Sequence, residues 1–171
     1  MVEWDSRDGV FCPTRGGLLR AASVFYGGKF EGGADYETVD LDARWYFAVD
    51  DERVLAVQAV GKAERGTIPF TELARLDLLR GVKDTRFTDR FSFLTQAEYR
   101  FPLRGPWSGV VFAGTGEVSH RAEGWTFGGL KAAGGAGIRY ALDRRQKIHL
   151  RLDVAAGPDG INPYFQMLEA F

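Results

Sequence analysis

Cysteine is nearly absent from this sequence, which contains Cys12 alone among 171 residues. A single cysteine excludes a disulfide framework within the chain and any multi-cysteine metal site, so we expect Cys12 to be a bystander. An excess of charge is missing too, because 22 basic and 23 acidic residues leave a formal net charge of -1. A near-neutral chain gives no reason to expect a nucleic-acid partner.

Long apolar runs are also lacking, and this excludes a membrane-spanning helix, which needs roughly 20 predominantly apolar residues. The first residues lack the basic and apolar regions of a secretion signal. No GxSxG or HExxH motif occurs, and the only two histidines, His120 and His149, stand far apart in the sequence. We therefore expect no enzymatic activity, with no catalytic residue, no metal site and no cofactor.

Residues that alternate with a period of two are abundant, and this pattern is typical of β-strands. Together with 22 glycines and an aromatic content of 13%, it fits a soluble β protein or a membrane barrel equally well. The alternation predicts an all-β, antiparallel chain of about eight to nine strands. The expected strands are Val2–Arg7, Leu18–Tyr26, Thr38–Val49, Leu55–Glu64, Phe91–Phe101, Trp107–Val118, Gly135–Leu142, Ile148–Val154 and Ile161–Phe171.

The connections between these strands alternate between short and long. Short turns are expected at Asp50, Pro102 and Asp143, and longer loops after Tyr26, Arg65, Val118 and Gly157. The loop after Arg65 is the longest, with roughly two dozen residues, and a loop of that length is usually functional or disordered. Short turns at one end and long loops at the other favour a transmembrane barrel. A soluble sandwich or lipocalin-like barrel remains the alternative.

The two faces of the expected strands differ in composition. One face carries compact charges of both signs, which can pair across neighbouring strands inside a polar lumen: Asp40, Asp42, Arg44, Lys62, Glu64, Glu98, Arg100, Arg139, Arg151 and Asp153. The other face carries aromatic residues beside the short turns, where a membrane-interface girdle would lie: Trp45, Phe47, Tyr99, Phe101, Trp107, Tyr140 and Phe171.

Several short motifs occur in the order expected for one known family. They are DSRD followed by PTRG near the start, LRG in the long loop, QAEYRFPL, GVVFAGTGEV, AGGAGIRYAL, KIHLRLDVAAG and the terminal EAF. On these motifs the chain resembles, over nearly its whole length, the bacterial surface antigen family. This family comprises the carboxy-terminal barrel domains of outer-membrane assembly and translocation proteins such as BamA and TamA.

The resemblance implies a role for the long loop. In that family the loop folds into the barrel lumen, and an arginine at its tip pairs with an acidic residue of the inner wall; here Leu79, Arg80 and Gly81 match the tip. The family's aspartate, two residues after a phenylalanine, corresponds to Gly114 after Phe112. We therefore expect Glu98 to accept a bidentate bond from Arg80. The alternative is a solvated Arg80, with Glu98 paired only to a neighbour.

The resemblance also implies location and partners. Residues 1–171 would form one outer-membrane barrel domain, a fragment corresponding to the C-terminal half of a larger barrel whose upstream periplasmic domains are absent from this chain. Its partners would be the outer-membrane lipid bilayer and unfolded outer-membrane or secreted polypeptides, and Phe171 would serve as the C-terminal barrel signal. A passive structural barrel or pore and a soluble ligand-binding β-barrel are the alternative functions.

Overall fold

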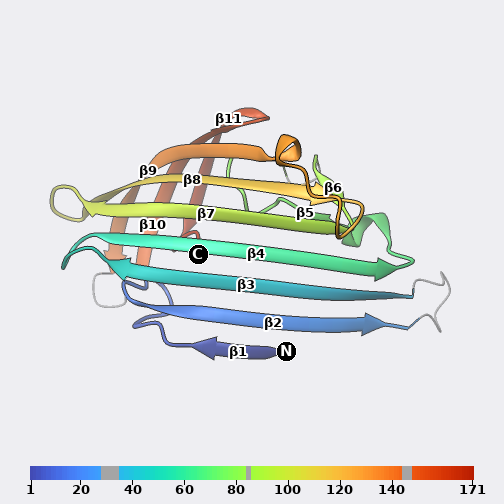
Figure 1. Cartoon of the computed structure of the whole chain (residues 1–171). Coiled ribbons are helices and arrows are strands. Elements are labelled where there is room, and N and C mark those ends of the chain that lie inside the picture. The colour runs from blue at the N-terminus through green and yellow to red at the C-terminus, as the bar shows by residue number, and fades with distance from the viewer. Residues whose placement is uncertain (28–34, 84–85, 144–147) are drawn as a thin grey trace.

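The computed structural model describes residues 1–27, 35–83, 86–143 and 148–171. Nine antiparallel strands form one sheet in which every strand pairs with its neighbours in chain order (Figure 1). Their bounds are β1 (Val2–Asp5), β2 (Gly16–Tyr26), β3 (Tyr36–Ala48), β4 (Val54–Gly66), β7 (Phe91–Pro102), β8 (Trp107–Ser119), β9 (Lys131–Asp143), β10 (Ile148–Gly157) and β11 (Gly160–Met167). The prediction of an all-β chain of about nine antiparallel strands is confirmed.

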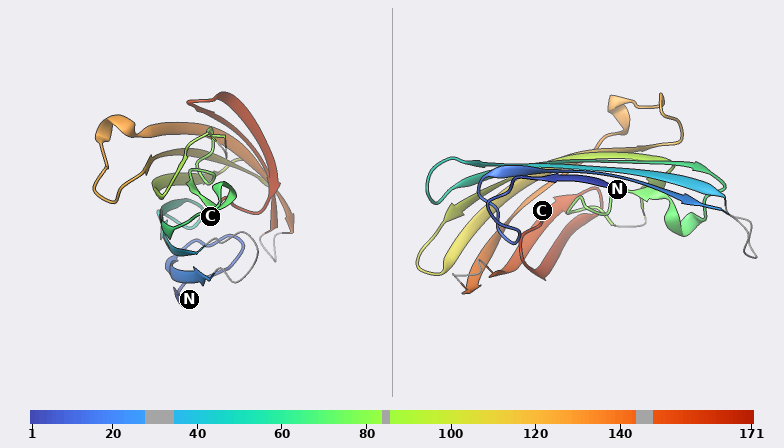
Figure 2. Two further views of the ribbon diagram at one scale, coloured as in Figure 1. Left: turned by 90° about the vertical axis from the view of Figure 1, so that its right-hand side faces the viewer. Right: turned by 90° about the horizontal axis from the view of Figure 1, so that it is seen from below.

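The sheet curves around a concavity, and the segment between β4 and β7 fills part of it (Figure 2). Within the described residues, β1 and β11 each pair with a single neighbour, so the sheet has two edges. The helices among the described residues are the short 3₁₀ turns η1 (Phe70–Glu72) and η2 (Phe127–Gly129). Neither of them is long and apolar enough to cross a membrane.

The distribution of polar and apolar residues over the two faces is the reverse of that in a water-soluble sheet protein. Glu98 on β7 and Asp153 on β10 point into the concavity and are 0% exposed. On the convex face, Leu41 and Phe47 of β3 are each 50% exposed. Alternation along the strands produces both faces, because successive side chains point to opposite sides of a sheet.

The long connection between β4 and β7 is folded inward. It contains η1 and a small ladder of β5 (Ala74–Arg75) with β6 (Thr88–Asp89). Three of its apolar side chains, Leu76, Leu79 and Val82, are nearly fully buried and form a core cluster with Leu94 of β7 and Ala133 of β9. A buried apolar cluster therefore joins this loop to the concave face.

The C-terminal segment, residues 168–171, also lies in the concavity. Leu168 adopts a positive φ of 68°, which ends the extended conformation of β11 and turns the chain inward. As a result, Phe171 packs against Tyr46 of β3 and Val54 and Ala56 of β4, and it is only 6% exposed. The expectation that Phe171 belongs to the outward aromatic face is therefore wrong, because strand alternation stops before this residue.

The expected long loop after Gly157 is also corrected. Gly157 pairs with Gly160, so Pro158 and Asp159 alone form the turn between β10 and β11. Gly160 has a φ of 87°, a conformation that favours glycine in tight turns. The expected loop after Tyr26 and the turn after Asp143 fall mainly on residues 28–34 and 144–147, which lie outside the described residues.

The turn between β10 and β11 holds the inward loop at a second point. The Asp159 carboxylate accepts a hydrogen bond of 2.8 Å from the backbone N–H of Lys83 and forms an ion pair with Arg86. The hydrogen bonds from Arg86 and Lys83 hold the pKa of Asp159 below its ordinary value of 3.8. This contact therefore favours the ionised carboxylate.

The lowered pKa of Asp159 predicts a pH dependence of loop docking. Because the folded-state pKa is lowered, the contact contributes fully above pH 3.8 and is lost as the pH falls through the lowered value. We expect the Lys83 amide to lose hydrogen-exchange protection in that acidic range, and Asp159→Asn to reduce its protection already at neutral pH. The control is Asp51→Asn in the turn between β3 and β4. Unchanged Lys83 protection in Asp159→Asn would contradict this role.

Candidate functional site

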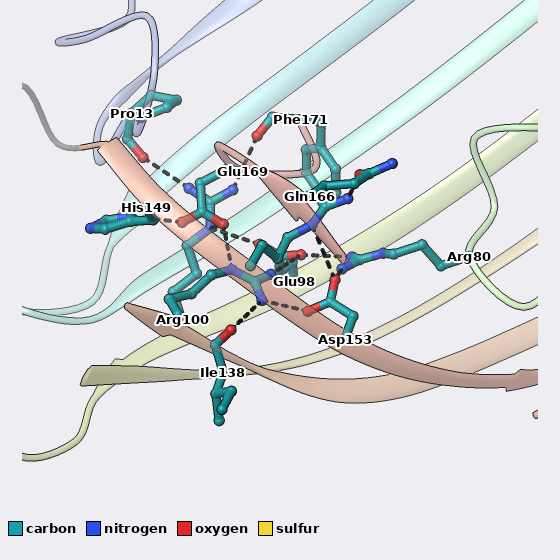
Figure 3. Close-up of polar contacts among 12 residues, drawn as sticks. Pro13, Arg80, Glu98, Arg100, Ile138, His149, Asp153, Gln166, Glu169 and Phe171 are labelled. Carbon is teal, nitrogen blue, oxygen red and sulfur yellow. Dashed lines mark hydrogen bonds and ion pairs between the residues drawn. The ribbon is translucent and has the colours of Figure 1, made fainter. Parts of the chain in front are cut away.

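The tip of the inward loop places Arg80 between two acidic residues of the concave face (Figure 3). The two terminal nitrogens of its guanidinium donate to different carboxylates, one to Glu98 of β7 and one to Asp153 of β10, each at 2.6 Å. The guanidinium also lies over the ring of Phe112, 3.4 Å from the ring centroid. One loop side chain thereby joins two strands that are not neighbours in the sheet.

This Arg80 site is almost completely removed from solvent. The side chains of Glu98 and Asp153 are 0% exposed, and that of Arg80 is 6% exposed. Burying a charge costs several kcal/mol per ion, and only well-placed opposite charges and hydrogen bonds offset that cost. Charge-assisted bonds to guanidinium are among the stronger hydrogen bonds in proteins. The geometry therefore specifies one position for the loop tip.

Three further arginines of the concave face complete the network. Arg100 donates to Glu98 at 2.8 Å, and Arg139 forms an ion pair with Asp153. Arg151 lies 3.5 Å from Asp153. Each acidic residue of the Arg80 site thus has arginine partners on the strands as well as on the loop.

The C-terminal segment supplies a third carboxylate. Glu169 accepts a hydrogen bond of 3.0 Å from Arg139 and lies 3.1 Å from Nδ1 of His149. Burial raises the pKa of Glu169, but the hydrogen bond from His149 and the charges of Arg100 and Arg139 outweigh it and lower this pKa to about 2. Arg100 also donates to the backbone carbonyl oxygen of Phe171 at 3.0 Å. The C-terminal segment is therefore bound to the same network as the loop.

Close backbone approach fixes the rest of the loop tip. The backbone N–H of Gly81 donates to the Tyr164 hydroxyl of β11 at 2.7 Å. Gly81 has a φ of 99°, and a Cβ on Gly157 would lie 2.4 Å from the Gly81 carbonyl oxygen. Glycine is required on both sides of this contact because a larger residue would push the loop away from β10.

The structure brings most of the sequence-predicted site residues together. Arg80 contacts both Glu98 and Phe112, so Arg80 is not a solvated loop residue. The expected bidentate bond to Glu98 alone is wrong, because the second nitrogen of the Arg80 guanidinium is taken by Asp153. Gly114 lies against the loop, because a Cβ there would lie 2.7 Å from Cδ1 of Leu79. A larger side chain at this position would therefore collide with the inward loop.

Sequence reasoning missed Asp153 as the second partner of Arg80. Alternation placed Asp153 on the polar face, but β10 is separated from β7 by β8 and β9. Only the curvature of the sheet makes the two carboxylates converge. The roles of Tyr164 and Glu169 were also missed: no motif includes Tyr164, and the terminal EAF motif, which includes Glu169, does not indicate its partners.

A scan against protein-family models finds no match, and a search of curated proteins finds none either. The family resemblance of the short motifs therefore stays a prediction. The contacts of the Arg80 network position a loop and the C-terminal segment on this face.

Truncation of Arg80 tests this positioning role. Arg80→Ala leaves Glu98 and Asp153 buried with fewer positive partners, but the strand arginines still compensate them. We expect a loss of about 3 kcal/mol in the free energy of unfolding, the lower end for a broken buried ion pair. Denaturant unfolding followed by tryptophan fluorescence measures this loss.

The matched control is Arg104→Ala, which removes an exposed arginine from the turn between β7 and β8. We expect it to change the free energy of unfolding by less than about 0.5 kcal/mol. Equal effects of the two variants would show that the Arg80 contacts do not hold the loop.

Proposed function

We propose that this chain is part of an integral outer-membrane β-barrel that helps to insert or translocate other polypeptides, as in the bacterial surface antigen family that its motifs resemble. The concave face would line a polar lumen, and the convex face would contact lipid. Its clients would be unfolded outer-membrane or secreted polypeptides. The observation that carries this proposal is the reversed placement of charged and apolar side chains on the two faces.

The reversed faces support a lipid environment for a physical reason. Water-soluble proteins rarely expose extended apolar surface, because hydration of that surface is unfavourable. Here the exposed side chains of the convex strand surface include Leu41, Phe93, Val111, Leu152, Val154 and Phe165. Lipid solvates such side chains without cost, whereas the buried charges require the enclosed, paired interior that the concavity supplies.

Strand length and aromatic placement support the same proposal. The strands β3, β4, β8 and β9 each contain 13 residues, and a tilted transmembrane strand needs only about 9–11. Trp107 and Tyr140 contact each other with ring centroids 4.9 Å apart, beside the short turn between β7 and β8. Such aromatic pairs are typical of the membrane interface of barrels.

The sheet edges connect the proposal to a larger barrel. A strand edge exposes unpaired N–H and C=O groups, which lipid cannot satisfy. Because β1 and β11 are edges among the described residues, we propose that further strands of a larger barrel, or a partner strand, pair with them. The chain would then correspond to the C-terminal half of that barrel.

Two alternatives have less support. A soluble barrel that binds an apolar ligand needs an apolar interior, whereas this concavity is lined by Glu98, Asp153 and four arginines. A passive pore needs an open interior, whereas the inward loop and the C-terminal segment occupy this one. An assembly factor that holds a loop inside its lumen is consistent with both features.

The lipid-facing role of the convex face predicts detergent-dependent folding. We expect the chain to acquire β circular dichroism and heat-modifiable gel migration in detergent micelles or lipid, but not in plain buffer. Leu41→Arg, near the middle of β3, should then cost about 2–4 kcal/mol in lipid. Val10→Arg is the control, because Val10 is exposed in the connection between β1 and β2. A folded, monodisperse chain in plain buffer would refute the membrane assignment.

The assembly role predicts a catalytic effect on folding of another membrane protein. We expect the chain, reconstituted in liposomes, to accelerate insertion of a small unfolded outer-membrane barrel relative to empty liposomes. Arg80→Ala should reduce the acceleration because it releases the inward loop. Ion conductance without any acceleration of insertion would favour the passive pore and contradict the assembly role.

A further inference from the structure

Three side chains with metal-binding atoms meet at the end of the concavity that carries the β3–β4 and β7–β8 turns. They are Cys12 from the connection between β1 and β2, His149 from β10 and Glu169 from the C-terminal segment. The thiol sulfur, one imidazole nitrogen and one carboxylate oxygen all lie within 4.8 Å of one another. No sequence pattern indicates this cluster, because 136 residues separate Cys12 from His149.

We propose that Cys12, His149 and Glu169 form a binding site for a thiophilic divalent metal ion of the zinc class. Thiolate, imidazole and carboxylate are the three ligand types that Zn²⁺ prefers in proteins. This site is independent of the proposed membrane function, because it requires only that the chain fold as described.

The spacing of the three ligand atoms suits a tetrahedral ion. Bonds of about 2.0–2.3 Å place neighbouring ligand atoms roughly 3.5 Å apart. Nδ1 of His149 and Oε1 of Glu169 are already 3.1 Å apart. Because all three ligand atoms lie within 4.8 Å of one another, a shift on the order of 1 Å in the Cys12 side chain would bring its sulfur to the required distance. Cys12 lies on the connection between β1 and β2, and connections between strands accommodate such a shift easily.

The surroundings leave the ligand atoms available. Arg139 binds the other oxygen of Glu169, Oε2, at 3.0 Å, so Oε1 remains directed at His149. A hydrogen bond of this kind orients a ligating carboxylate. The two nearby cations also have carboxylate partners outside the cluster, because Arg100 pairs with Glu98 and Arg139 pairs with Asp153. The positive charge of Arg100 and Arg139 therefore repels a bound cation less strongly than the charge of two unpaired arginines would.

The cluster opens into a cavity of about 350 Å³ that is lined by all three proposed ligands. The cavity gives a metal ion access and leaves space for a water molecule as the fourth ligand. On binding, the ion replaces the thiol proton and any proton held between His149 and Glu169, so uptake of the ion releases protons.

A bound ion would connect the two margins of the sheet. Cys12 follows β1, which is one edge strand, whereas His149 lies on β10 and Glu169 follows β11, which is the other edge strand. Arg100 of β7 already links the two chain segments beside these margins, because it donates to the Pro13 carbonyl oxygen at 3.4 Å and to the Phe171 carbonyl oxygen at 3.0 Å. The metal would therefore stabilise the curved form of the sheet.

Cobalt binding tests the site directly. The folded chain, kept reduced, is titrated with Co²⁺, and absorption is recorded in the near-ultraviolet and visible range. We expect one equivalent to bind with thiolate-to-cobalt charge transfer and the visible bands of tetrahedral cobalt, and Zn²⁺ to abolish both signals. Zn²⁺ should also raise the denaturant midpoint of the wild-type chain.

Variants separate the proposed ligands from other residues. Cys12→Ser should abolish the charge-transfer band, and His149→Gln should weaken Co²⁺ binding at least about tenfold, since even loss of a supporting partner costs that much. His120→Gln is the matched control, because His120 is exposed and pairs with Asp89 instead. Circular dichroism verifies that each variant folds.

Two results would overturn the proposal. One is a folded wild-type chain without a cobalt–thiolate band at millimolar Co²⁺. The other is Co²⁺ affinity in Cys12→Ser or His149→Gln within twofold of the wild-type value. Because the variants retain the Arg80 site, a negative result here leaves the membrane and assembly tests unaffected.

Discussion

The ion pairs of Arg80 with Glu98 and Asp153 are the contacts on which the rest of the interior depends. Both carboxylates are fully buried, so each requires positive partners at hydrogen-bond distance. Arg80 meets this requirement only when the loop between β4 and β7 folds inward and the sheet curves enough to bring β7 and β10 together. Loop position, sheet curvature and charge compensation are therefore one coupled arrangement, in which removing a single member leaves a buried charge under-compensated.

The C-terminal segment extends this arrangement toward the β3–β4 and β7–β8 turns. Glu169 shares Arg139 with Asp153, and the Phe171 carbonyl oxygen shares Arg100 with Glu98. The loop and the C-terminal segment thus occupy opposite parts of one concavity and are connected through strand arginines. Such shared partners couple the effects of substitutions, so changes at the two segments should not be additive. The proposed metal ligands lie at the margin of this network, where the C-terminal segment approaches the connection after β1.

Much of the fold was predictable because strand alternation is a local property. The alternation around Glu98 predicted which side chains of β7 face inward, and similar patterns identified the other strands of the sheet. Arg80 and Glu98 were predicted as partners from a motif and an inward-facing position. Asp153 was not predicted as a partner of Arg80, because register and curvature across three intervening pairings decide which residues of distant strands converge. Phe171 was assigned to the wrong face, because a single positive φ at Leu168 ends the alternation.

By itself the sequence determined the strands and, for most of them, which face is charged, since these depend on periods of two residues and on local turn residues. The tertiary structure alone decided that Gly114 makes room for Leu79, that Asp153 completes the Arg80 site, and that Cys12 lies beside His149 and Glu169. These outcomes require contacts between residues far apart in the chain. Such contacts follow from how the sheet curves and where the loop and C-terminal segment pack within it, and no short sequence pattern encodes that geometry.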